Sequence, residues 1–119
     1  MHTWPYLNDS MPRFLNSEHI YPTRRRPVKV LIDNLTSSDP GIQKIYIFGS
    51  SVTGACKPWS DIDVWVEGWD SSIPHVTPMV EINEDYGDFE FDIWGTKHPP
   101  ELWQSVLSEG VLVYDKDLD

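Results

Sequence analysis

Two aspartates, Asp61 and Asp63, stand two positions apart at the start of an apolar run. Side chains on a β-strand alternate between its two faces, so both carboxylates project from the same face and Ile62 projects from the other. Hard divalent cations such as Mg²⁺ prefer carboxylate oxygens as ligands. The pair therefore indicates a metal site on one face of a strand.

A third aspartate, Asp92, lies in a later strand-like run from Phe89 to Trp94. It can complete the group if its strand lies beside the first, and a bound cation would remove the repulsion between the like charges. Two Mg²⁺ ions held there could clamp a triphosphate and lower the pKa of an acceptor hydroxyl for in-line attack on the α-phosphorus. The three carboxylates are thus candidate metal ligands and catalytic residues.

A Gly-Ser turn, Gly49 and Ser50, follows the predicted strand Lys44 to Phe48, with Asp61 beyond it. Glycine lets a backbone approach closely where a side chain would obstruct it, and serine offers a hydroxyl and an amide to a phosphate oxygen. This turn is the candidate phosphate-binding segment.

The remaining elements that must position these groups follow from periodicity and from turn signals. An irregular arm over residues 1–23 precedes a domain over residues 24–119. Its pattern predicts an α/β (α+β) fold, a small mixed β-sheet with helices packed on one face and the other face partly open. The predicted elements are an amphipathic helix that ends before Asp39, strands over 44–48 and 61–67, a hairpin of strands 79–83 and 89–94, a helix from Pro99 or Pro100 to Gly110, and a strand over 111–114.

Composition narrows the function classes. The chain has 119 residues, 39% hydrophobic content and a net charge of −10. Such acidity argues against a nucleic-acid partner, since binding to a nucleic-acid backbone depends on Lys and Arg. No run reaches the roughly 18 apolar residues of a membrane span. The single cysteine, Cys56, fits a reducing compartment, so a cytoplasmic protein is expected.

The spacing of six residues resembles the signature of the polymerase beta-type nucleotidyltransferase superfamily, and its closest fit is the minimal nucleotidyltransferases of bacteria and archaea. The matching residues are Gly49, Ser50, Gly54, Ser60, Asp61 and Asp63. The preceding helix, the strand with Asp92 and the closing helix and strand also follow the family order. The resemblance covers roughly residues 24 to 115.

This resemblance implies a role for each matching residue. Asp61 and Asp63 bind two Mg²⁺ ions, Asp92 binds the catalytic ion or acts as base, and Gly49, Ser50 and Ser60 contact the nucleotide. The implied activity is transfer of a nucleoside monophosphate from a magnesium-bound triphosphate, with ATP the first candidate, to an acceptor hydroxyl with release of pyrophosphate. Protein adenylylation is one form of that reaction.

The alternative is an antitoxin or other protein-binding module, with or without catalysis, because minimal nucleotidyltransferases resemble antitoxins encoded beside HEPN-domain toxins. A HEPN-type toxin and a second copy of the chain are therefore both candidate partners. One departure bears on nucleotide affinity. The family often has an arginine soon after Gly-Ser, where this chain has residues 51–53, Ser-Val-Thr, and Lys57 is the nearest candidate replacement.

Two further groups have open interpretations. The basic run Arg24 to Arg26 could meet an acidic partner or RNA, although a solvated helix face is favoured. Three tryptophans, Trp59, Trp65 and Trp94, could stack a base near the carboxylates or pack in the core.

Overall fold

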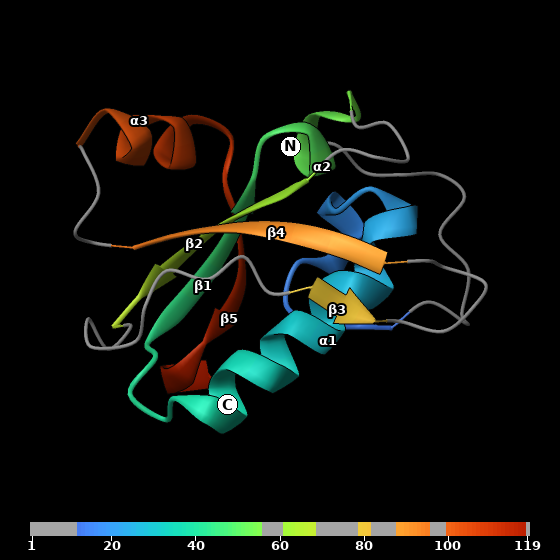
Figure 1. Ribbon diagram of the computed structural model, residues 1–119. Coiled ribbons are helices and arrows are strands. Elements are labelled where there is room, and N and C mark those ends of the chain that lie inside the picture. Colours follow the sequence, from blue (N-terminus) through green and yellow to red (C-terminus); the bar gives the residue numbers. More distant parts are fainter. Residues whose placement is uncertain (1–11, 56–60, 69–78, 82–87, 96–99, 119) are drawn as a thin grey trace.

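The computed structural model describes residues 12–55, 61–68, 79–81, 88–95 and 100–118 (Figure 1). Each predicted strand is present, and its ends lie within one residue of the prediction, except that the strand predicted over 79–83 is described only to Glu81 because residues 82–87 lie outside the described part of the chain. The first helix begins at Pro22, a residue type that suits the first helical turn because its missing N–H has no partner there. The elements are η1 (Ser17–His19), α1 (Pro22–Ser38), β1 (Lys44–Phe48), α2 (Ser50–Thr53), β2 (Ile62–Glu67), β3 (Met79–Glu81), β4 (Asp88–Gly95), α3 (Pro100–Glu109), β5 (Val111–Asp115) and η2 (Lys116–Leu118).

The described strands form one mixed sheet in the order β3-β4-β2-β1-β5. β1 runs antiparallel to both β2 and β5, whereas β2 runs parallel to β4. β3 pairs antiparallel with β4, as the hairpin prediction requires, and its connecting turn lies outside the described residues. The expected α/β class with a small mixed sheet is confirmed.

Helix α1 covers one face of the sheet and closes an aliphatic core. Branched residues that alternate along β1 and β2 point toward this helix, which is why these strands bury every second side chain. The fully buried members include Val28 and Leu31 of α1 and Ile47, Ile62 and Val64 of the strands.

Helix α3 lies on the other face, so the helices are divided between the two sides of the sheet (Figure 1). This differs from the predicted packing on one face, because Phe48 and Trp65 give the second face an apolar patch for α3 to cover. It packs Val106 against Phe48 and Trp65, and these three buried residues form a second, smaller cluster. The cluster covers only part of that face, which is also the face that carries Asp63. None of the helices in the described residues is long and apolar enough to cross a membrane.

Part of the expected N-terminal arm packs against the domain. Ile20 is fully buried in the α1 core. The Asn16 side-chain N–H donates to the backbone oxygen of Leu112 at 2.8 Å, on the edge strand β5. This contact pairs a carbonyl that an edge strand would otherwise present to solvent.

Candidate functional site

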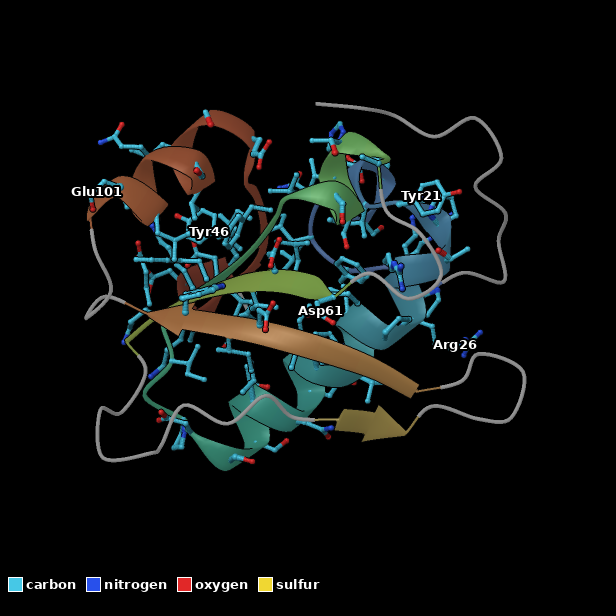
Figure 2. The ribbon with its side chains drawn as sticks, turned by 45° about the horizontal axis from the view of Figure 1, so that its top comes forward. Tyr21, Arg26, Tyr46, Asp61 and Glu101 are labelled. Atoms are coloured by element: carbon cyan, nitrogen blue, oxygen red, sulfur yellow. The ribbon has the colours of Figure 1, made fainter. Side chains whose placement is uncertain are left out.

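The sheet register brings the candidate carboxylates together. β2 and β4 pair in parallel with Asp63 opposite Asp92, so the two side chains project from the same face of neighbouring strands. Asp61 precedes β2 by one residue and is exposed, whereas Asp63 and Asp92 are half-buried. The pairing of Asp63 with Asp92 and the effect of the Asp61 charge on Asp63 therefore bring the three predicted residues together near the start of β2, where Figure 2 shows Asp61.

The proximity of these carboxylates alters the acidity of Asp63. The pKa of Asp63 is raised from 3.8 to about 6, first by burial and then, in decreasing order, by the charges of Asp92, Asp61 and Glu109. Desolvation disfavours the charged form of an acid, and neighbouring negative charges do the same. Asp63 is thus the centre of a cluster whose ionised form calls for a cation.

Gly49, the residue that follows β1, lies against the carboxylate of Asp63. It ends the strand with φ 74° and ψ −147°, a conformation that residues with a Cβ rarely adopt. A Cβ at this position would overlap Oδ2 of Asp63. Only glycine therefore lets the backbone of the Gly-Ser turn lie directly against the central carboxylate.

The Gly49 backbone also starts the short helix α2, because its carbonyl accepts the N–H groups of Val52 and Thr53 at 3.0 and 3.1 Å. Ser50 is the first residue of α2 and is partly exposed. The predicted contact Ser60 and the candidate cation Lys57 lie outside the described residues, so their placement beside this turn stays a prediction.

A fourth carboxylate, Glu109, belongs to the same site and was not singled out from the sequence. The Gly49 N–H donates to Glu109 Oε1 at 3.2 Å, across 60 positions of the chain. Glu109 is the last residue of α3, a helix with no basic residue in its final turn. A carboxylate opposes the helix dipole at that end. This unfavourable position is the one signal in the sequence that could have drawn attention to Glu109.

The donor set fits Mg²⁺ in chemical type, because carboxylate oxygens are its preferred protein ligands and three further carboxylates lie close enough to Asp63 to raise its pKa. Among the described residues, however, no three His, Cys, Asp or Glu side chains already stand in an arrangement that could hold an ion. The strands place the carboxylate residues close together, and their side chains would have to rotate for the carboxylate oxygens to coordinate one ion.

The basic run at the start of α1 differs from the favoured expectation of a solvated face. Arg24 and Arg25 are only 1% and 0% exposed. The Arg25 Nε–H donates to the Ser17 carbonyl at 2.8 Å, and the Tyr21 N–H donates to the Ser51 carbonyl at 2.8 Å. The arm and α2 thus cover this end of the helix. The prediction was wrong because an isolated helix pattern does not reveal which segment packs over it.

The tryptophans near the carboxylates serve chiefly in packing. Trp65 is 4% exposed and its ring lies 5.2 Å from that of Trp103 in α3, which in turn meets Tyr46 edge-on at 5.7 Å. Trp94 lies opposite Trp65 in the register and packs against the same cluster. Base stacking by Trp65 is thereby disfavoured, and Trp59 lies outside the described residues.

An Asp-x-Asp strand beside a third aspartate, below a Gly-Ser turn on a mixed sheet, is the arrangement expected of a nucleotidyltransferase domain. The family model "Polymerase beta, Nucleotidyltransferase" matches residues 31–119 of the chain. The protein therefore belongs to the polymerase beta nucleotidyltransferase family.

A solved structure supports the same fold. It is described as "Crystal structure of the toxin-antitoxin with AMP-PNP", and it aligns with a TM-score of 0.55 over 76% of this chain and 75% of that chain. The two sequences are 22% identical, so the similarity concerns the fold alone. No curated protein matches the sequence.

Proposed function

We propose that the protein is a metal-dependent nucleotidyltransferase that transfers a nucleoside monophosphate from a triphosphate to an acceptor hydroxyl. The observation that carries this proposal is that Asp63 stands opposite Asp92 in the sheet and that its carboxylate lies against the backbone of Gly49. Carboxylates that could bind cations therefore lie beside a backbone turn that a phosphate group could approach. ATP is the first candidate donor, since AMP-PNP is named with the similar solved structure.

Each residue has a distinct task in this reaction. Asp61 and Asp63 would hold the cations, while Asp92 would hold the catalytic cation or take the proton of the acceptor hydroxyl. Gly49 and Ser50 receive the phosphate oxygens through an amide and a hydroxyl. Two bound Mg²⁺ ions would neutralise charge on the triphosphate and the leaving group.

The bond changes balance without a further reactant. The acceptor oxygen forms a bond to the α-phosphorus as the bond from that phosphorus to the bridging oxygen breaks. Pyrophosphate leaves with the electron pair of that bond, and the hydroxyl proton passes to Asp92 or to solvent. The net charge of −10 favours an acceptor on a protein or small molecule over one on a nucleic acid.

Calorimetric titration of ATP, GTP, CTP and UTP with Mg²⁺ tests the proposal. We expect one of them to bind the wild-type protein and to lose measurable binding to an Asp61→Ala, Asp63→Ala double variant. The reason is that the variant removes the carboxylates that would hold the cations. Incubation with the bound triphosphate should then reveal pyrophosphate release once an acceptor is present.

A matched control removes the same charge elsewhere. An Asp33→Ala, Asp117→Ala double variant loses two exposed carboxylates, the first on α1 and the second in η2. It should bind the triphosphate like the wild type. If no triphosphate binds a folded wild-type protein, the catalytic proposal is wrong for the isolated chain.

A second candidate function is an antitoxin that acts by binding a protein partner, favoured by the toxin-antitoxin named with the similar fold. A HEPN-type toxin is the partner to test, by co-expressing the chain with a helical protein encoded by a neighbouring gene. Neutralisation that survives the Asp61→Ala, Asp63→Ala changes would support a binding module. Neutralisation lost with them, while the complex still forms, would favour adenylylation of the partner.

A further inference from the structure

The contact between Gly49 and Glu109 brings an anion to a backbone donor of the Gly-Ser turn. Glu109 Oε1 accepts the Gly49 N–H at 3.2 Å. Under the proposed function this N–H faces the phosphate side of the site. A carboxylate oxygen and a phosphate oxygen are alternative acceptors for the same donor, and one backbone N–H serves one of them well at a time.

The surroundings of Glu109 favour its departure from Gly49 once another acceptor for the Gly49 N–H is present. Its charge lies close enough to Asp63 to raise the pKa of that residue. It also stands at the negative end of α3, where a carboxylate is disfavoured. The side chain is only partly buried, so rotation can carry its carboxylate toward solvent.

We propose that Glu109 occupies the Gly49 amide as an internal substitute for a phosphate oxygen and must leave it when a triphosphate binds. The inference rests on the proposed function, because it assumes that the Gly-Ser turn receives the triphosphate. Glu109 then sets the selectivity of the site for the magnesium-bound form. Free triphosphate meets the full repulsion of the carboxylate, whereas magnesium-bound triphosphate meets it with part of its charge neutralised.

Two substitutions separate this role from the alternatives. Glu109→Gln keeps an oxygen that can accept the Gly49 N–H but removes the charge, and Glu109→Ala removes both. We expect calorimetry to show triphosphate binding tightened about five-fold or more in both variants with Mg²⁺ present, since one repulsive charge near the phosphates is gone. The gain should be larger without Mg²⁺, so the dependence of binding on Mg²⁺ should weaken.

The matched control is Glu101→Gln, which removes the same charge from the other end of α3. Glu101 is exposed and lies far from Asp61 (Figure 2), about 12 Å along the helix axis from Glu109. The affinity of the Glu101→Gln variant for the triphosphate should stay within about two-fold of wild type, because a distant exposed charge is screened. Circular dichroism and thermal unfolding establish that all three variants fold.

The other outcomes overturn the proposal in distinguishable ways. If Glu109→Gln binds like wild type and Glu109→Ala binds more weakly, Glu109 only holds the Gly49 backbone in place. If both variants bind the triphosphate more weakly than wild type, and only when Mg²⁺ is present, Glu109 is a fourth cation ligand. If the wild type binds the triphosphate and neither variant changes the affinity, the proposal for Glu109 is wrong and the proposed function stands. The absence of binding by wild type and both variants removes the two together.

Discussion

The two faces of the central sheet differ in what they bury. On the α1 face, Ile62, Val64 and Val66 of β2 are 0% exposed and belong to an aliphatic core. On the α3 face of the same strand, Trp65 belongs to the second apolar cluster and Asp63 belongs to the group of carboxylates. One strand thus carries the stability of the fold on one side and the candidate chemistry on the other.

The contrast has a physical basis in the alternation of the strand. A carboxylate on the α1 face would lose its hydration without a partner, at a cost of several kcal/mol. The α3 face is only partly covered, so its carboxylates keep contact with water while remaining close to one another. Changes on the first face should therefore act on unfolding, and changes on the second should act on charge and ligand binding.

The largest effect is expected for Phe91→Ala on the α1 face of β4. Phe91 is 0% exposed in the aliphatic core. Loss of the ring should lower the free energy of unfolding by about 3–5 kcal/mol, through lost apolar contact and an unfilled cavity. Urea unfolding followed by circular dichroism measures it. Leu107→Ala on α3, where the side chain is 61% exposed, should change it by less than about 0.5 kcal/mol. Similar losses in the two variants would contradict the division of the faces.

The next effect concerns the point where the Gly-Ser turn meets the carboxylate face. Gly49→Ala should cost about 2–3 kcal/mol, because φ 74° strains a residue with a Cβ and the added carbon overlaps Asp63 Oδ2. In an Asp63→Ala background the overlap disappears and the backbone strain alone remains. A double-mutant cycle by urea unfolding should therefore give a coupling of about 1 kcal/mol between the two positions. Additive costs would mean that the turn and the carboxylate are not in contact.

The features that could be predicted from the sequence are those set by local pattern. Alternation along 44–48 and 61–67 located β1 and β2, and the Gly-Ser and Asp-x-Asp spacing identified the family. The apolar run around Asp92 located β4, although only the register of the sheet shows that Asp92 stands opposite Asp63.

The features that could not be predicted depend on contacts between distant segments. Glu109 reaches Gly49 across 60 positions because α3 folds back over β1, and no local pattern encodes that packing. Arg24 and Arg25 are buried for the same kind of reason, since η1 and α2 close over the start of α1. Local periodicity finds elements, but the covering of one element by another is a tertiary property.

The smallest expected effect is an increase in the free energy of unfolding, and it tests the charge of Asp63 on the α3 face. The pKa of Asp63 is raised from 3.8 to about 6 in the folded protein, so ionised Asp63 lowers stability fully above about pH 6. This penalty fades as the pH falls from 6 toward 3.8, because the folded state then holds a proton that the unfolded state has released. Asp63→Asn should accordingly raise the free energy of unfolding near neutral pH by about 1 kcal/mol, after allowance for solvent screening of a half-exposed group.

Urea unfolding of wild type and Asp63→Asn as a function of pH measures this difference. The gain should shrink toward zero below the ordinary pKa of 3.8, and Asp33→Asn, an exposed position on α1, should show no comparable gain at any pH. An Asp63→Asn variant that is less stable than wild type near neutral pH would show that the carboxylate contributes to the fold. A gain in stability joined to lost triphosphate binding would place Asp63 among residues whose charge is unfavourable for folding and required for the ligand.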